Sequence, residues 1–371
     1  MRFAGALAFT LALTTICKAE QQFIVVSKDG RGFSFAESGE RFVPWGFNYP
    51  AGSKLLEDSW ESDWDTVIQD FHEMRELGAN VVRVHLQVAQ FMEGADRPNA
   101  KSLAQLAKLL QLAEETGLYL DVTGLGSYRP ADGPAWYDAL SRDERWAVQG
   151  RFWSAVAEVC SKSPAVFCYD LMNEPVVPGE ARKPGAWRSG KLLGGLDFVQ
   201  CISLDAPDRP RDEIAEEWIK TLTKAIREKD KRHLITVGML PWVKRWGHLS
   251  GFVPEKNAPD LDFISVHIYP ASGKLDEARE VLQKFSVGKP VVIEETFNLS
   301  CSAPELREFL LESRGKAVGW IGHYAGESLA DLDELQKSGQ LTIPQAITRQ
   351  WLELFKSLGP EMLEGTAAGV K

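Results

Sequence analysis

The chain has 371 residues, of which 44% are hydrophobic and 25% charged, and this ordinary globular composition excludes a disordered chain, a collagen-like repeat and a disulfide-dense miniprotein. Acidic residues outnumber basic ones by 52 to 42, and no Lys/Arg cluster occurs, so neither nucleic acid nor an anionic membrane surface is an expected partner. The length fits either about two domains or a single α/β barrel of roughly 250 residues or more.

The beginning of the chain has the pattern of an export signal. A basic start precedes an apolar run over residues 4–16 that is too short to span a membrane. We therefore expect residues 1–19 to be a signal peptide and residues 20–371 to form one exported domain, either secreted or periplasmic. A lipoprotein acylated at Cys17 fits less well, because Ile16 precedes it where a small residue is expected. No later stretch is long and apolar enough to predict a membrane span.

After this segment, the sequence predicts a short β-hairpin and then strands that alternate with helices. The hairpin covers residues 22–41 and turns at Asp29-Gly30. Short apolar runs predict eight strands, at 42–48, 80–86, 118–123, 165–172, 233–239, 261–268, 289–294 and 316–322. Helical patterns occupy 62–77, 101–116, 143–161, 211–229, 274–285, 303–313 and 343–358.

This alternation predicts an α/β fold with a parallel sheet. Strands that are buried on both faces read as continuous apolar runs, and eight strand–helix units close into a single (β/α)8 (TIM) barrel. A doubly wound open sheet is the alternative. It would normally carry a Gly-rich phosphate loop, and neither Gly46-Phe47-Asn48 nor Gly124-Leu125-Gly126 has the required spacing.

Two long loops leave the predicted C-terminal face of the barrel, where barrel active sites lie. Residues 176–210 follow the fourth strand and residues 240–260 follow the fifth. Long loops are usually functional, and Trp stacks on flat apolar faces such as those of sugars. The chain contains 12 Trp but only 7 Tyr. The tryptophans of these loops, Trp187, Trp242 and Trp246, are the candidates for such stacking, whereas the alternative for any single Trp is packing in the core.

Acidic residues end two of the predicted strands. Glu174 follows the fourth strand, and Glu294 and Glu295 end the seventh. These strands lie three β/α units apart, so their carboxylates face each other across the barrel mouth. A carboxylate at the end of a buried strand is costly unless it is paired, hydrated or catalytic. Two facing carboxylates, one protonated and one ionised, are the machinery of glycoside hydrolysis.

Five short motifs stand at the predicted strand ends. They are Gly46-Phe47-Asn48, Val82-Arg83-Val84, Asn173-Glu174-Pro175, His267-Ile268-Tyr269 and the run from Lys289 to Glu295. These motifs, in this order, resemble those of glycoside hydrolase family 5, a family of retaining β-glycosidases that includes cellulases and mannanases. The resemblance covers residues 42–325 and implies a (β/α)8 barrel.

The resemblance implies roles for the acidic residues. Glu174 would be the general acid/base and Glu295 the nucleophile, with carboxyl groups about 5–5.5 Å apart, and Asn173 would bind the sugar 2-hydroxyl. The two-residue period of a strand leaves Glu294 open as the nucleophile, whereas the motif register favours Glu295. Glu294 would then face a helix and bind a neighbouring Lys or Arg.

The resemblance also implies supporting residues around the nucleophile. Arg83 would pair with Glu295 and keep it ionised, while Tyr269 would hydrogen-bond to it and His267 would line the same subsite. A structural ion pair for Arg83 and an ordinary buried histidine for His267 are the alternatives. Asn48 matches the family's asparagine on the first strand.

Other residues near the predicted barrel mouth leave their roles open. His85 contacts either the substrate or the core, and Asp121 on the third strand is either part of the site or structural. The family commonly ends its eighth strand with a tryptophan, but His323 or Tyr324 falls near that position here. Thr123 stands where cellulases of the family often carry a histidine, so the cellulase-specific pattern is incomplete.

The cysteines suggest a disulfide rather than a metal site. Cys160, Cys168, Cys201 and Cys301 remain after signal removal, and an even number in an exported chain allows one or two bridges. We predict a Cys201–Cys301 disulfide across the cleft rim. No Cys-x-x-Cys or Cys/His ligand spacing occurs, so we expect neither a metal nor an organic cofactor.

These features predict an exported retaining β-glycoside hydrolase that works by double displacement. Its expected partner is a β-linked polysaccharide or oligosaccharide such as β-1,4-glucan or β-1,4-mannan, and its oligomeric state stays open. Two alternatives remain. A carbohydrate-binding barrel without catalysis would lack one of the two glutamates, and a transglycosylase would use the same residues with a sugar as acceptor.

Overall fold

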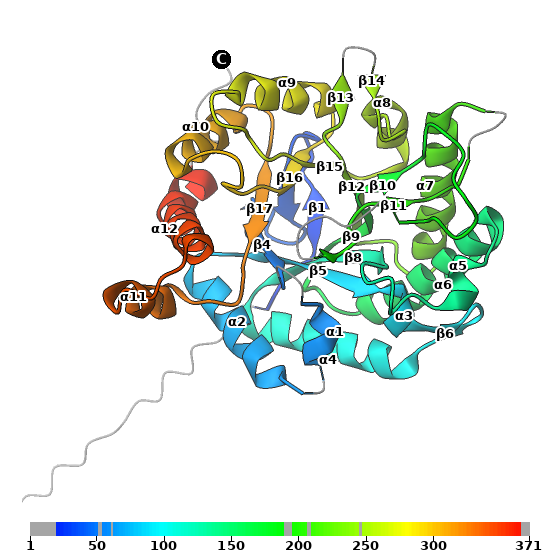
Figure 1. Ribbon diagram of the computed structural model, residues 1–371, viewed down its shortest axis with the longest axis horizontal. Helices are drawn as coiled ribbons and strands as arrows, with labels where there is room; N and C mark the ends of the chain where they lie inside the picture. The colour runs from blue at the N-terminus through cyan, green and yellow to red at the C-terminus, as the bar shows by residue number, and fades with distance from the viewer. Residues whose placement is uncertain are drawn as a thin grey trace, which may run out of the picture.

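The computed structural model describes residues 20–364 apart from 51–53, 61, 189–194, 206–208 and 245–246. Eight parallel strands close into a barrel (Figure 1), which confirms the predicted (β/α)8 fold. They are β4 (Trp45–Tyr49), β5 (Val81–Gln87), β8 (Tyr119–Gly126), β9 (Val166–Asn173), β12 (Leu234–Met239), β15 (Ile264–His267), β16 (Val291–Glu295) and β17 (Gly319–His323). The predicted signal peptide, with Cys17, lies outside the described residues.

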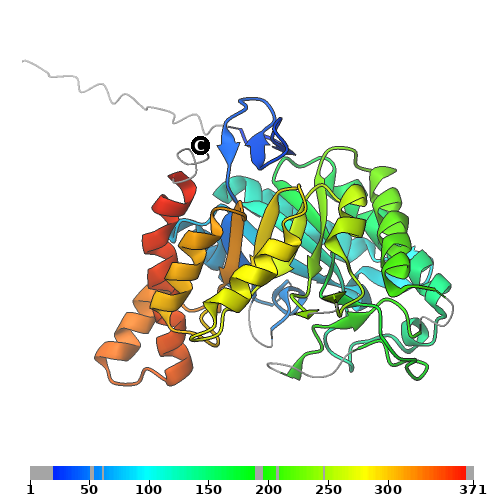
Figure 2. The ribbon, with the colours of Figure 1, turned by 90° about the horizontal axis from the view of Figure 1, so that it is seen from above.

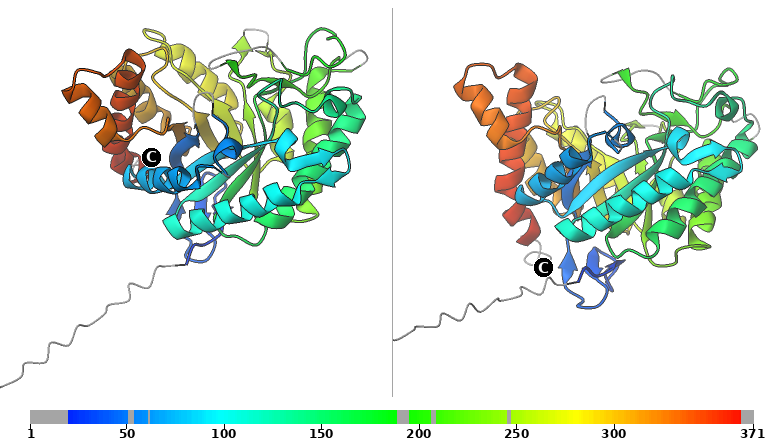
Figure 3. Two further views of the ribbon diagram at one scale, coloured as in Figure 1. Left: turned by 60° about the horizontal axis from the view of Figure 1, so that its bottom comes forward. Right: turned by 90° about the horizontal axis from the view of Figure 1, so that it is seen from below.

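Helices surround the strands, as Figures 2 and 3 show from several sides. The predicted helices are all present, as α2 (Trp64–Glu76), α4 (Ala100–Thr116), α6 (Arg142–Cys160), α7 (Arg211–Arg227), α9 (Leu275–Phe285), α10 (Ala303–Ser313) and α12 (Ile343–Glu364). Ser141 and Ser302 begin α6 and α10 with capping boxes, which satisfy otherwise unpaired backbone N–H groups. Among the described helices, none is both long and apolar enough to cross a bilayer.

Several short helices were not predicted, because a single turn is too short to show a helical hydrophobic period. These are α1 (Leu56–Ser59), α3 (Val88–Phe91), α5 (Ala135–Asp138) and α8 (Pro254–Asn257). A longer one, α11 (Leu329–Lys337), lies between β17 and α12 and packs against α12. These additions leave the order of the barrel units unchanged.

The predicted N-terminal hairpin belongs to a three-stranded antiparallel sheet. It comprises β1 (Ile24–Val26), β2 (Phe33–Phe35) and β3 (Arg41–Phe42), with Gly30 at positive φ in the turn. Phe33 packs edge-on against Phe167 of β9 and against Phe263 just before β15. The sheet, dark blue in Figure 2, therefore covers the end of the barrel from which the strands start.

Short paired strands stabilise the loops at the opposite end. β10 (Pro175–Val176) pairs with β11 (Gln200–Cys201), β13 (Val243–Lys244) with β14 (Gly247–His248), and β6 (Met92–Gly94) with β7 (Arg97–Pro98). The predicted loops 176–210 and 240–260 are therefore partly ordered by their own strand pairs.

The predicted Cys201–Cys301 disulfide is wrong. Cys201 is buried in the small β10–β11 sheet, and its N–H donates to the carbonyl of Trp187. Cys301 is half-buried in the turn that precedes α10. Both are free thiols, as are the buried Cys160 and Cys168. The loop of Cys201 is held by the β10–β11 pair, whereas the segment before Cys301 pairs through Ser300 with Ala271, and no bridge joins the two cysteines.

Candidate active site

A cavity of about 650 Å³ opens where the barrel strands end. The predicted site residues that line it are Asn48, His85, Asn173, Glu174, Tyr269, Glu295 and His323. Arg83 and His267 are fully buried and contact the lining glutamates. The structure thus brings together every predicted site residue except Trp242.

Glu174 enters the cavity from a turn that follows β9. Its φ of 48° lies in the left-handed region, which a residue other than glycine rarely adopts. The backbone N–H of Glu174 donates to the carbonyl of Gly238 on β12 at 2.9 Å, which fixes the turn. Such a conformation costs about 1–2 kcal/mol and is typical of functional sites.

A bulge in β16 turns two consecutive glutamates toward the barrel. The β15–β16 register runs regularly to Val266 and Ile293 and then shifts, so that His267 is opposite Glu295. Glu294 is the extra residue, and a bulge of this kind redirects side chains that would otherwise alternate between faces. Glu295 lines the cavity, whereas Glu294 is fully buried 3.7 Å from Arg83. The expectation that Glu294 faces a helix is therefore wrong.

Arg83 connects the strand ends from inside the barrel. Its Nη1 donates to Oε1 of Glu295 and to Oδ1 of Asn48, both at 2.7 Å. Its Nη2 donates to Asp170 at 2.7 Å and to Oδ1 of Asn173 at 2.9 Å. A guanidinium is well suited to this role because its donors lie in a rigid planar fork. Arg83 thereby orients three cavity-lining side chains, those of Asn48, Asn173 and Glu295.

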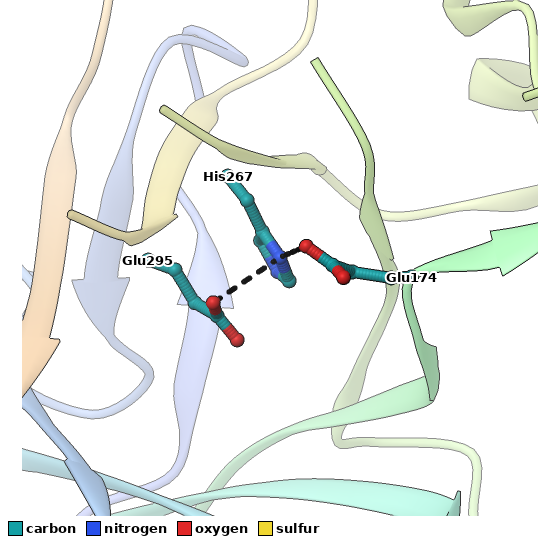
Figure 4. A group of neighbouring side chains, drawn as sticks. All are labelled: Glu174, His267 and Glu295. Atoms are coloured by element: carbon teal, nitrogen blue, oxygen red, sulfur yellow. Dashed lines mark hydrogen bonds and ion pairs between the residues drawn. The ribbon is translucent and has the colours of Figure 1, made fainter. Parts of the chain in front are cut away.

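His267 lies between the two cavity glutamates (Figure 4). Its Nδ1 is 3.0 Å from Oε1 of Glu174 and 3.5 Å from Oε2 of Glu295. Burial lowers the pKa of His267, but the charge of Glu295 and contacts with Glu174 and Glu294 raise it to about 10. The ring is therefore a cation that faces both carboxyl groups at neutral pH.

Glu295 is held in its ionised form. Burial raises its pKa, but the positive charges of His267 and Arg83 outweigh burial and hold the pKa well below its usual range. The hydroxyl of Tyr269 donates to Oε2 of Glu295 at 2.6 Å, and a hydrogen bond to the charged form acts in the same direction. An ionised carboxylate in a cavity can act as a nucleophile.

Glu174, His267 and Glu295 are also the one group, among the described residues, with ligand atoms close enough together to hold a metal ion. A protonated imidazole has no lone pair to offer a metal. Because His267 is cationic and its Nδ1 faces both carboxyl groups, these residues fit a hydrogen-bonded group rather than a metal site.

His323 and His85 both line the cavity. The Nε2 of His323 is 2.8 Å from the Tyr269 hydroxyl, and the two rings are stacked. Tyr324, the other residue considered for this position, is buried outside the cavity and bonds to Asp70. The Nδ1 of His85 lies 2.7 Å from the hydroxyl of Tyr128, so His85 has both a packing contact and an exposed edge toward the cavity.

The loop tryptophans do not form the predicted set of sugar platforms. Trp187 is buried, its indole N–H donates to the carbonyl of Asp138, and the guanidinium of Arg145 stacks on its ring. Trp242 is 42% exposed but is not among the residues that line the cavity. Trp246 lies outside the described residues.

Several cavity residues carry no motif and were not predicted. Phe198, Phe297 and Leu299 form apolar parts of the wall, and they come from loops whose shape the sequence pattern does not reveal. Asp170 is buried behind the cavity and binds Arg83. Its position three residues before Asn173 on β9 is the only sequence signal that could have identified it.

The comparisons with known proteins agree on one family. Residues 37–312 match the model of Cellulase (glycosyl hydrolase family 5). A mannan endo-1,4-beta-mannosidase of Arabidopsis thaliana is 28% identical over 138 residues, which cover 33% of this chain and 25% of that protein. A probable mannan endo-1,4-beta-mannosidase of Aspergillus flavus is 23% identical, with coverage of 63% and 62%. This chain thus covers less than two thirds of the length of either relative.

Among solved structures, an exo-beta-1,4-mannosidase of an Opitutaceae bacterium superposes with a TM-score of 0.65 at 18% identity. The superposition covers 93% of this chain and 64% of that one, and it supports the barrel fold. The family match covers most of the chain and includes both strand ends that carry the cavity glutamates. The protein therefore belongs to glycosyl hydrolase family 5.

Proposed function

We propose that this protein is a retaining β-glycoside hydrolase with Glu174 as general acid/base and Glu295 as nucleophile. The observation that carries the proposal is the closeness of the two carboxyl groups. One oxygen of each, together with a ring nitrogen of His267, lie within 4.8 Å of one another. Retaining glycosidases hold their carboxyl groups about 5–5.5 Å apart, whereas inverting enzymes need about 6.5–9.5 Å to admit a water.

The proposed reaction has two displacements. Glu295 attacks the anomeric carbon while Glu174 gives its proton to the departing oxygen, so the glycosidic bond breaks as a glycosyl–enzyme ester forms. Glu174, now ionised, takes a proton from water, and the resulting hydroxide displaces Glu295 from the sugar. The sugar leaves with its original configuration, and both glutamates return to their starting protonation states.

The proposed substrate is a β-1,4-linked mannan or its oligosaccharides. Its support is the naming of the similar proteins, since the plant relative, the fungal relative and the bacterial structure are all described as β-1,4-mannosidases. The absence of a tryptophan at the end of β17, where His323 stands, also separates this site from the family's common cellulase pattern. We further propose that residues 1–19 direct export and are then removed.

The test is a substrate panel with matched variants. Wild-type protein should release sugars from β-1,4-mannan and mannooligosaccharides faster than from β-1,4-glucan or xylan. Glu295→Gln should abolish turnover of an aryl β-mannoside without loss of fold, whereas Glu312→Gln on the surface of α10 should retain it. Turnover in Glu295→Gln would refute the assignment, and assays with added acceptor sugars would reveal transglycosylation. N-terminal sequencing of the exported protein tests the signal peptide.

A further inference from the structure

A third carboxylate lies behind the two cavity glutamates. Glu294 is fully buried and does not line the cavity, so it cannot touch a substrate there. The hydroxyl of Ser265 donates to its Oε1 at 3.0 Å. Its Oε2 is 3.5 Å from Nε2 of His267 and 3.7 Å from Nη2 of Arg83. A buried carboxylate with these neighbours needs an account beyond packing.

The position of Glu294 means that His267 contacts carboxylates from both ring nitrogens. Its Nδ1 faces Glu174 and Glu295, and its Nε2 faces Glu294. A neutral imidazole has one N–H and one bare nitrogen, so it would direct a lone pair at one of these carboxylates. Only the doubly protonated ring presents an N–H on both sides.

Gly238 provides the space for this arrangement. A Cβ at Gly238 would lie 2.9 Å from Oε2 of Glu294, 2.9 Å from Nε2 of His267 and 3.0 Å from Nη2 of Arg83. At these distances a side chain at residue 238 would force its neighbours to move. Because Gly238 on β12 has no side chain, Glu294, His267 and Arg83 can approach one another in the barrel interior.

Asp121 is a further buried carboxyl group that interacts with Glu294. It is fully buried, and neither of its oxygens has a hydrogen-bond partner among the described residues. Burial, followed by the charge of Glu294, raises the pKa of Asp121 well above its usual range and so favours its neutral form, whose O–H can donate a hydrogen bond to Glu294. Arg83 and His267 counteract burial and hold the pKa of Glu294 below its usual value.

We propose that Glu294 is a positioning residue that holds His267 from behind in its doubly protonated form, with the Nδ1–H aimed at Glu174 and Glu295, and that neutral Asp121 supports Glu294 by donating to it. The inference rests on the catalytic roles proposed for the two cavity glutamates. It extends the catalytic site by one layer into the barrel interior, to residues that never meet the substrate.

The other charged groups around His267 define what a substitution would change. Those that act on the ring, besides Glu294, are Arg83, Glu174, Glu295, His85 and His323. Asp170 and Asp121 lie one layer further away, against Arg83 and Glu294. Glu294→Gln therefore removes one of three carboxylates in contact with the ring and leaves the others in place. Loss of a nearby negative charge lowers the proton affinity of a histidine.

The test is the titration of His267 followed by NMR on 15N-histidine-labelled protein, with His267→Asn used to assign the signal. In wild-type protein both ring nitrogens should be protonated at neutral pH, with a midpoint far above that of an ordinary histidine. In Glu294→Gln the midpoint should fall by about 1–2 pH units. Glu312→Gln, which makes the same charge change on the surface, should leave it in place.

Two further readouts separate positioning from a merely structural role. In Glu294→Gln, kcat should fall above the new midpoint while KM stays unchanged, because Glu294 does not line the cavity. Asp121→Asn keeps a neutral hydrogen-bond donor at this position and should preserve the titration midpoint of His267. A lower midpoint in this variant would mean that Asp121 is normally ionised, and it would overturn the supporting role proposed for Asp121.

A single protonated nitrogen on wild-type His267 at neutral pH would overturn the whole proposal, as would equal midpoints in wild-type protein and Glu294→Gln. The wild-type spectrum decides the question even if Glu294→Gln does not fold. The NMR titration needs no substrate. A wild-type protein that cleaves no β-glycoside would therefore refute the proposed function separately from the positioning role.

Discussion

Arg83 and Glu295 form a buried ion pair in which Nη1 of the arginine donates to Oε1 of the glutamate at 2.7 Å. The same guanidinium binds Asp170 and lies 3.7 Å from Glu294. One cation thus compensates several carboxylates in the barrel interior. This relationship makes Arg83 important for stability as well as for the charge of Glu295.

Arg83→Met should destabilise the fold strongly. Removing one partner of a buried ion pair typically costs about 3–5 kcal/mol, because the remaining charges stay buried without compensation. Urea denaturation measures this loss. Arg279→Met is the control, since Arg279 pairs with acidic residues on the surface of α9 and α10, where an ion pair contributes about 0–1 kcal/mol. Equal stability losses in the two variants would contradict the account.

Tyr269→Phe should move the acidic limb of the pH–activity profile to higher pH. The Tyr269 hydroxyl donates to the ionised form of Glu295, so its removal raises the pKa of that carboxyl. The acidic limb of kcat/KM reports the ionisation of the nucleophile in the free enzyme. Tyr137→Phe removes a buried hydroxyl that bonds to Gln149 and should leave this limb in place. A shift to lower pH in Tyr269→Phe would refute the assigned hydrogen bond.

Glu174→Gln should lose more activity on substrates whose leaving group must be protonated as the glycosidic bond breaks. Positioned acid catalysis contributes about 10²–10⁴-fold, so hydrolysis of mannooligosaccharides should fall by that factor. An aryl glycoside with an acidic phenol as leaving group needs little protonation, so its first step should be affected less. Pre-steady-state release of the phenol checks this difference. Equal losses on both substrates would mean that Glu174 is not the proton donor.

Gly238→Ala should disturb the network around His267. The new Cβ would lie within 3.0 Å of Glu294, His267 and Arg83, and such overpacking typically costs about 1–3 kcal/mol. Gly150→Ala in α6 is the matched control, because its Cβ would make only an ordinary 3.7 Å contact with Ala225. It should stabilise the helix by about 0.5–1 kcal/mol. Thermal unfolding should therefore show a lower Tm for Gly238→Ala and a higher Tm for Gly150→Ala than for the wild-type protein.

The barrel could be predicted from sequence because its strands are buried on both faces and alternate regularly with amphipathic helices. Glu174 and Glu295 could be located because acidic residues end two of those apolar runs. These signals are local, and they depend on the residue types themselves. The three-stranded form of the N-terminal sheet was missed because β3 has only two residues, too few to show a strand pattern.

The orientation of Glu294 could not be predicted, since a strand without a bulge would point it away from Glu295. The bulge depends on how β16 pairs with β15, which is a property of the folded barrel. Trp187 was placed wrongly for a similar reason. Its burial results from contacts with Asp138 and Arg145, which come from other parts of the chain. The disulfide failed because the number and spacing of cysteines do not fix the distance between loops.

The central claim is that Glu174 and Glu295 hydrolyse a β-glycoside with retention, and the anomeric configuration of the first product tests it most directly. Proton NMR of a mannooligosaccharide digest, recorded before mutarotation, should show the β-anomer of the newly formed reducing end. Initial appearance of the α-anomer would mean a single displacement by water. That result would contradict the nucleophilic role of Glu295 and the account built on it.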